Sequence, residues 1–307
     1  MPDVNVNVDA EVDADADERI VAVNGAELCV QAFGAPGDPP LLLIAGASES
    51  MDWWDDELCA MLAAGGRRVI RYDNRDTGRS VFSPMGAPGY DLDDLVADAV
   101  GVLDAFGVPR AHVMGFSLGG MLAQRLAVDH AARVGTVTLV GTTPDGPDPS
   151  GPPSVDGRRA AAGQPRPLPD WSDPVAVTEY LVTGRQPFAG TRGYDEERLR
   201  AVVGRAVART RSMPTCLVNH WLVDNGTPVR PRLGGVVAPA LVVHGTEDPL
   251  FPFGDAEALA AEIPGAALLP VEGAGHQVPP RWAWDWFVPA VLRHTATGTG
   301  TNATVGG

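Results

Sequence analysis

The stretch AHVMGFSLGGMLAQ, residues 111–124, joins an apolar run to a serine among glycines and then to a helical pattern. Its first six residues predict a buried strand, and the residues from Leu118 onward predict a helix. Between them Gly115, Ser117 and Gly119 fit G-x-S-x-G, in the strand–turn–helix context that this motif needs. Such a sharp turn brings strand and helix so close that side chains at 115 and 119 would clash. The glycines therefore serve either the packing of a helix on a strand or the presentation of a strained, exposed serine for chemistry.

Strand and helix patterns alternate along most of the chain. Strands are expected at 20–33 (a hairpin around an Asn-Gly turn), 40–46, 67–73, 111–116, 134–141, within 238–249 and at 266–273. Helices are expected at 53–66, 91–108, 118–130, 255–263 and around 282–295. Alternating strands and helices with short connections predict an α/β fold, with a mostly parallel central sheet and helices on both of its faces.

A helical insertion is predicted between two strands of this sheet. The residues after Thr143 are dense in Pro and Gly, so no strand can continue through them. Helical patterns follow at 175–184, 195–211 and roughly 214–226. The expected organisation is an acidic flexible tail at 1–18, an α/β core at 19–143, a helical cap or lid at 144–235, the rest of the core at 236–294 and a flexible tail at 295–307.

The charge balance argues against several partners and chemistries. A net charge of −16 is unfavourable for binding nucleic acid or an anionic membrane surface. No apolar stretch approaches the roughly 18–20 residues of a membrane span, and the acidic N-terminus is not expected to be a secretory signal. All 23 residues counted as Lys or Arg are arginine, which excludes Schiff-base chemistry, attachment of pyridoxal phosphate and a P-loop lysine.

Cysteine and histidine usage predicts neither disulfides nor a metal site. The 3 cysteines are an odd number without C-x-x-C spacing, and a reducing cytoplasm is the expected compartment. The 6 histidines show no metal-ligand spacing, so no metal is predicted. No organic cofactor is predicted either, and the oligomeric state is left open.

Two residues further along the chain complete a constellation for nucleophilic catalysis. A serine hydroxyl needs a base to take its proton, and the base needs an acid to fix its tautomer. Asp248 follows the apolar run of 238–249, and His276 follows the last predicted strand in a Gly-rich loop. Taken alone, Asp248 could be a turn former before a proline and His276 a surface loop residue. Asp145, at another strand end, is the alternative acid.

An oxyanion hole requires two backbone N–H groups that face the tetrahedral intermediate. One is expected from Leu118, the residue after the nucleophile. The other is expected from Ala47, in the loop IAGASES that follows the early buried strand.

With these residues placed, the chain resembles the α/β-hydrolases over nearly its whole length outside the tails. The loop RYDNRDTGRS (71–80) is similar to the D-x-R-G-x-G-x-S loop of that family, with Asp76-Thr77 in place of the usual glycine. This variant, together with HGTEDPLFP (244–252) and GAGHQVP (273–279), resembles the aclacinomycin methylesterases of polyketide biosynthesis. In that loop, Asp73 and Arg75 are expected to form a structural ion pair.

The resemblance implies a serine hydrolase with Ser117, Asp248 and His276 as its triad, and ester cleavage on an aromatic polyketide or a similar secondary metabolite. It also implies a lid at the helical insertion. Candidates for lining an apolar pocket under the lid are Phe188, Met213, His220, Trp221, Phe251 and Phe253. Ordinary packing within the insertion is the alternative role of each.

The leading hypothesis is an enzyme, a carboxylic ester hydrolase that acts on a small, largely apolar molecule through an acyl-enzyme. The same triad could instead perform carbon–carbon bond hydrolysis, cofactor-free perhydrolysis, or acyl transfer and cyclisation. A hydrolase-like protein that binds its ligand without turnover is the alternative of a different class. A serine at position 117 argues against haloalkane dehalogenase and epoxide hydrolase chemistry, which use a carboxylate nucleophile.

Overall fold

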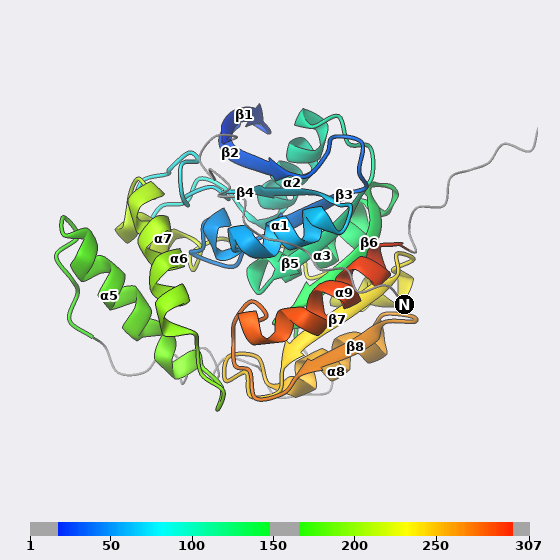
Figure 1. Cartoon of the computed structure of the whole chain (residues 1–307). Coiled ribbons are helices and arrows are strands. Elements are labelled where there is room, and N and C mark those ends of the chain that lie inside the picture. Colours follow the sequence, from blue (N-terminus) through cyan, green and yellow to red (C-terminus); the bar gives the residue numbers. More distant parts are fainter. Residues whose placement is uncertain (1–17, 148–165, 297–307) are drawn as a thin grey trace, which may run out of the picture.

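The computed structural model describes residues 18–147 and 166–296, and in it the described strands form one sheet. Their order across the sheet is β1-β2-β4-β3-β5-β6-β7-β8 (Figure 1). The bounds are β1 Arg19–Val23, β2 Ala26–Phe33, β3 Pro40–Ile44, β4 Arg68–Tyr72, β5 Ala111–Phe116, β6 Val134–Val140, β7 Ala240–Gly245 and β8 Ala267–Val271. β1 pairs antiparallel with β2, and β2 with β4, whereas the other neighbouring pairs are parallel. The predicted mostly parallel sheet is confirmed.

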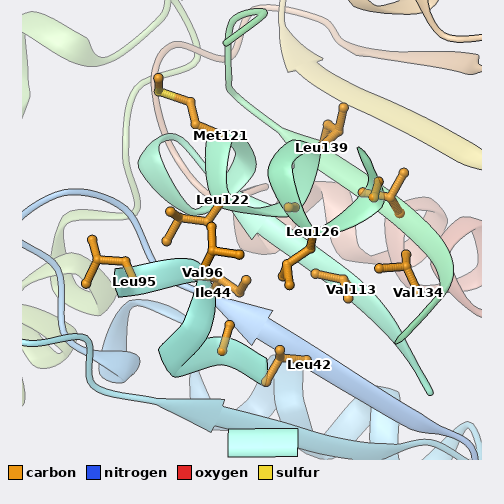
Figure 2. Packing of buried hydrophobic residues seen from close by; sticks show 14 of the residues in the cluster. Leu42, Ile44, Leu95, Val96, Val113, Met121, Leu122, Leu126, Val134 and Leu139 are labelled. Atoms are coloured by element: carbon orange, nitrogen blue, oxygen red, sulfur yellow. The ribbon is translucent and has the colours of Figure 1, made fainter. Parts of the chain in front are cut away.

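Helices cover both faces of the sheet, as predicted. α2 (Leu92–Ala105), α3 (Leu118–Asp129) and α8 (Phe253–Glu262) bury apolar side chains against one face, and α1 (Asp56–Ala64) and α9 (Trp284–Ala296) against the other. Strand β3 shows why its sequence is continuously apolar. Leu42 and Ile44 point toward α2 and α3, as Figure 2 shows, whereas Leu41 and Leu43 belong to the cluster on the opposite face. Within 18–147 and 166–296, no helix is both long and apolar enough to cross a membrane.

The segment between β6 and β7 contains the helices predicted for the insertion. α5 (Pro174–Arg185), α6 (Glu196–Arg209) and α7 (Met213–Asn219) lie together beside the sheet (Figure 1). α7 ends earlier than the pattern at 214–226 predicts. The Pro-rich residues 148–165 lie outside the described part of the chain.

The tails begin and end differently from the prediction. Residues 1–17 and 297–307 lie outside the described ranges. Glu18, expected as the last residue of a solvated tail, has a buried side chain that forms ion pairs with Arg79 and Arg209. Thr295 and Ala296, expected in the C-terminal tail, instead end α9, and the Thr295 hydroxyl accepts a hydrogen bond from Arg67.

A buried charge network joins α6 to the core. The Arg209 guanidinium pairs with Glu18 at 2.8 Å, Asp52 at 2.5 Å and Asp73 at 2.9 Å. Asp73 is therefore bound to Arg209, while Arg75 pairs with Asp98 of α2 at 2.7 Å. The prediction that Asp73 and Arg75 pair with each other is wrong, because each finds its partner on an element distant in sequence.

Replacing the central cation of this network should destabilise the fold. Arg209→Leu leaves Glu18, Asp52 and Asp73 buried without their shared partner, and we expect a loss of about 3–5 kcal/mol in the free energy of unfolding. The matched control is Arg200→Leu on the same helix, where the ion pairs with Glu179 and Glu196 are exposed and the change should stay below about 1 kcal/mol. Urea denaturation measures both, and equal losses in the two variants would contradict the expectation.

Candidate active site

Ser117 occupies the turn between β5 and α3. Its backbone has φ 53° and ψ −117°, in the left-handed region that non-glycine residues rarely adopt. Two hydrogen bonds hold this conformation: the Ser117 N–H donates to the carbonyl of Val140 at 3.0 Å, and the Thr142 hydroxyl donates to the Ser117 carbonyl at 2.8 Å. The turn is thus strained locally and fixed by its neighbours.

The glycines of G-x-S-x-G are required by close backbone packing. A Cβ atom at Gly115 would lie 2.0 Å from the carbonyl oxygen of Gly119, and one at Gly119 would lie 2.2 Å from the carbonyl oxygen of Ile44 in β3. Neither backbone can move aside without separating α3 from the sheet. The two roles that the sequence left as alternatives therefore coincide: the same close packing of helix on strand puts Ser117 in its turn.

Ser117, His276 and Asp248 form one hydrogen-bonded chain at the carboxyl ends of β5, β8 and β7. The distance from His276 Nε2 to Ser117 Oγ is 3.2 Å, and that from His276 Nδ1 to Asp248 Oδ2 is 2.7 Å. The other carboxylate oxygen of Asp248 accepts the backbone N–H groups of Leu250 at 2.8 Å and Phe251 at 2.9 Å. An acceptor at Nδ1 requires the proton to sit there, which leaves the Nε2 lone pair for the serine hydroxyl.

Aromatic rings enclose the imidazole of His276. The ring centroids of Phe116 and Phe251 lie 4.9 Å and 5.3 Å from it, and that of Phe188 lies 6.4 Å from it. The carbonyl of Phe188 also accepts the backbone N–H of His276 at 2.8 Å. The histidine is therefore held in ring orientation and in backbone position.

Asp145 takes a different position from Asp248. Its carboxylate pairs with Arg125 of α3 at 2.8 Å and accepts the backbone N–H of Val229. The oxygen bonded to His276 Nδ1 belongs to Asp248, so the alternative acid named from the sequence is occupied elsewhere.

The two candidate oxyanion donors border the same pocket as Ser117. The pocket encloses about 560 Å³ when its open mouth is counted, and its walls include Ala47 and Leu118. Among the described residues, no acceptor is hydrogen-bonded to the backbone N–H of Ala47 or of Leu118. Both groups therefore have a free donor at the edge of the cavity that the serine faces.

The walls of this pocket are mainly apolar. They are formed by Ala47, Ser117, Leu118, Met121, His220, Trp221, Val223, Asn225, Leu250 and Phe251. Of the predicted lining residues, Trp221, Phe251 and His220 are here. Met121 and Leu250 were not predicted. Their positions in the sequence could have indicated them, because Met121 lies one helical turn after Ser117 and Leu250 lies two residues after Asp248.

The other predicted lining residues lie elsewhere. Met213 borders a separate pocket with Ser48 and Cys216. Phe188 packs behind His276, and Phe253 at the start of α8 lies edge-on to His244, with ring centroids 6.2 Å apart. A larger pocket of about 650 Å³, counted with its mouth, borders the other side of His276. Its lining includes Trp53, Tyr194 and Trp284.

Comparisons with known proteins identify the family of the chain. The family model described as alpha/beta hydrolase fold matches residues 39–279. The chain belongs to the α/β-hydrolase family. The prediction of an enzyme with this fold is confirmed.

Two curated relatives share most of their length with this α/β-hydrolase. Rhodomycin D methylesterase DauP of Streptomyces sp. (strain C5) is 33% identical over 301 residues, which covers 92% of this chain and 99% of that protein. The methylesterase DnrP of Streptomyces peucetius gives the same identity and coverage. The resemblance to methylesterases is therefore confirmed, as is ester hydrolysis as the reaction class.

A solved structure has a similar fold. The enol-lactonase from Burkholderia xenovorans LB400 superposes on this α/β-hydrolase with a TM-score of 0.69 and 26% sequence identity. The match covers 91% of this chain and 100% of that chain.

The cysteines of this α/β-hydrolase are free and buried. Burial raises the pKa of the Cys29 and Cys59 thiols to about 12, and it also raises the pKa of Cys216. Because the thiolate is the reactive form, none of these cysteines is suited to be a nucleophile in the native protein.

Native protein should therefore resist iodoacetamide. At pH 8, about one molecule in ten thousand has an ionised Cys29 or Cys59. We expect no adduct in the intact mass of the folded protein after an hour, and full retention of activity. The denatured protein is the control and should gain 3 carbamidomethyl groups, one for each cysteine. Inactivation of the folded protein with stoichiometric labelling would contradict this reading.

The packing at Gly115 gives a second prediction. Gly115→Ala puts a methyl group against the backbone of Gly119, and we expect a loss of about 3 kcal/mol in unfolding free energy. Gly204→Ala in α6 is the matched control, because a Cβ atom there meets nothing within 4 Å. That variant should be neutral or more stable by about 0.5–1 kcal/mol. Chemical denaturation compares the two, and wild-type stability of Gly115→Ala would refute the packing argument.

Proposed function

We propose that this α/β-hydrolase cleaves a methyl ester of a largely apolar, polyketide-type compound through an acyl-enzyme on Ser117. The observation that carries the proposal is the hydrogen-bonded chain Ser117–His276–Asp248 at the edge of an apolar pocket. The methyl ester is proposed because two relatives that match this chain over nearly their whole length are named methylesterases.

In the acylation step, Ser117 Oγ attacks the ester carbonyl carbon while its proton passes to His276 Nε2. The distance of 3.2 Å between these atoms lies within the reach of such a transfer. The carbonyl oxygen becomes an oxyanion, and we assign the backbone N–H groups of Leu118 and Ala47 as its donors. Leu118 also begins α3, so the positive end of the helix dipole lies at the same place.

The tetrahedral intermediate then collapses. The bond to the alkoxy oxygen breaks, and His276 returns its proton to that oxygen, which leaves as methanol. Asp248 keeps the Nδ1 proton of His276 in place and stabilises the imidazolium that forms in between.

Deacylation repeats these steps with water as the nucleophile. His276 removes a proton from the water molecule as it attacks the acyl carbon, and Ser117 Oγ leaves with that proton. The products are the carboxylic acid and the free enzyme.

Trp221 and Phe251 are the side chains we propose to contact the acyl part of the substrate. They come from separate parts of the chain. Trp221 follows α7, and Phe251 lies in the turn after Asp248. The ring of Phe251 also packs on His276, so it can hold the substrate close to the base. Seven of the ten wall residues are apolar, and Ser117, His220 and Asn225 are the polar ones, which favours a substrate that is largely apolar.

We also propose a reducing cytoplasm as the compartment and a small-molecule ester as the partner. The three thiols are free and buried, and they form no disulfide among the described residues.

The first test is covalent labelling of the serine. Incubation with a fluorophosphonate should add one adduct to the wild-type protein and none to Ser117→Ala, as measured by intact mass. Heat-denatured wild type is the second control and should stay unlabelled, because only the folded triad activates the hydroxyl. A folded wild type that is not labelled would reject an activated serine and favour a protein that binds without turnover.

Turnover tests the reaction itself. A panel of aromatic polyketide methyl esters in water enriched in ¹⁸O should yield methanol and an acid with one ¹⁸O atom. We expect Ser117→Ala to lower kcat by at least about 10³-fold. Label that is absent from the product would instead indicate acyl transfer or cyclisation. Cleavage of a carbon–carbon bond in place of the ester would reject the methylesterase proposal.

A further inference from the structure

Ser48 is the second strained residue at the active site. Its φ of 61° lies in the left-handed region, and it directly follows Ala47 in the loop after β3. A non-glycine residue keeps such a conformation only when its surroundings over-determine it. The neighbours of Ser48 therefore decide where the N–H of Ala47 points.

Both peptide groups of Ser48 are held by α7 and the residue that caps it. The Ser48 N–H donates to His220 Nδ1 at 2.9 Å, and the Cys216 thiol contacts the Ser48 carbonyl oxygen at 3.4 Å. Cys216 and His220 are four residues apart, so they lie on the same face of the helix. A segment far away in the sequence thus fixes the oxyanion loop.

The hydrogen bonds of His220 define its tautomer. Nδ1 accepts from a backbone N–H, so the proton is on Nε2, which donates to the carbonyl of Arg75 at 2.7 Å. That acceptor is itself anchored, because Arg75 pairs with Asp98. The imidazole is buried and therefore bridges two loops with one ring orientation.

The amides on either side of Ala47 are both bound to side chains. The Gly46 N–H donates to Glu49 Oε2 at 3.2 Å, and the Ser48 N–H donates to His220. Glu49 is in turn paired with Arg185, the last residue of α5, at 2.8 Å. Of these three consecutive amides, the one without an acceptor in the described part of the chain is that of Ala47, which borders the pocket of Ser117.

We propose that His220 is a positioning residue for the oxyanion hole. By accepting the Ser48 N–H, it holds the strained loop in the conformation that directs the Ala47 N–H at the reacting carbonyl oxygen. This inference rests on the proposed function of Ser117 and Ala47. We therefore expect the loss of this hydrogen bond to lower kcat and to leave KM similar, although His220 is one of the pocket-lining residues.

Two amide substitutions, each of which keeps one of the two hydrogen bonds of His220, separate this role from packing. His220→Asn puts an amide oxygen where Nδ1 lies, so it can still accept the Ser48 N–H, and it loses the bond to Arg75. His220→Gln puts an amide nitrogen near Nε2, so it can still donate to Arg75, and it loses the bond to Ser48. Both are polar amides of similar volume, and their folded fractions can be compared by circular dichroism and thermal denaturation.

We expect the two variants to differ in kcat and to have similar KM values. We expect kcat of His220→Gln to fall by about 10- to 100-fold. This loss is smaller than that caused by removing an oxyanion donor, because the Ala47 N–H remains present but is less well directed. His220→Asn should stay within about 5-fold of wild type. A trifluoromethyl ketone, whose adduct with Ser117 places an oxyanion in the hole, should bind more weakly to His220→Gln by the same factor as kcat/KM.

Asn219→Ala is the matched control for loosening of α7. Asn219 Nδ2 donates to Asp76 at 2.8 Å, and its Oδ1 accepts the Gly86 N–H, so it anchors the same helix without touching the oxyanion loop. Equal losses of kcat in His220→Asn and His220→Gln, or as large a loss in Asn219→Ala, would overturn the inference. Wild type that hydrolyses no ester would instead reject the proposed function on which it rests.

Discussion

The close contact between β5 and α3 is the constraint on which the rest of the site depends. Gly115 and Gly119 allow backbone to approach backbone, and Ser117 between them is forced into a left-handed conformation. The strain is sustained because β6 supplies an acceptor for its N–H and Thr142 a donor for its carbonyl. Because β3, β5, β7 and β8 run in the same direction, their carboxyl ends lie at one end of the sheet. The loops that follow β3, β7 and β8 contain Ala47, Asp248 and His276.

Arginine chemistry explains how an acidic chain without lysine buries so many carboxylates. A guanidinium has five N–H donors in a rigid plane, so one side chain can serve several carboxylates at once. Arg209 does this for Glu18, Asp52 and Asp73, and Arg185 brings α5 to Glu49. The helices between β6 and β7 are thus attached to the core through charges, in addition to apolar contacts.

The sequence predicted the sheet because strands follow from local patterns, and the same patterns singled out three residues that the fold brings within hydrogen-bond distance. Apolar runs mark buried strands, and Ser117, Asp248 and His276 each stand directly after one. Local patterns do not show which side chains from distant elements will pair with each other. Asp73 and Arg75 stand two residues apart in one loop and were expected to pair with each other, whereas the fold gives them Arg209 and Asp98. Met213 was assigned to the pocket by residue type, and only the fold decides which side of α7 faces Ser117.

The early end of α7 shows how tertiary contacts override a helical pattern. The residues at 214–226 could continue as a helix, but Asn219 and His220 turn their side chains to Asp76, Arg75 and Ser48. Asp76 has a φ of 62°, a conformation that glycine would adopt freely. Its carboxylate accepts the Tyr90 hydroxyl at 2.7 Å as well as the Asn219 amide.

Asp76 therefore has a structural role in this loop. A carboxylate at position 76 gives α7 a fixed point on the core, next to the imidazole of His220 that accepts the Ser48 N–H. A segment that only covered the pocket would need apolar contacts and little else. The helix that ends at Asn219 instead uses directional hydrogen bonds to two strained loops, and such bonds constrain position more tightly than burial does. The end of α7 is thereby tied to the loops after β3 and β4 by hydrogen bonds of Asn219 and His220.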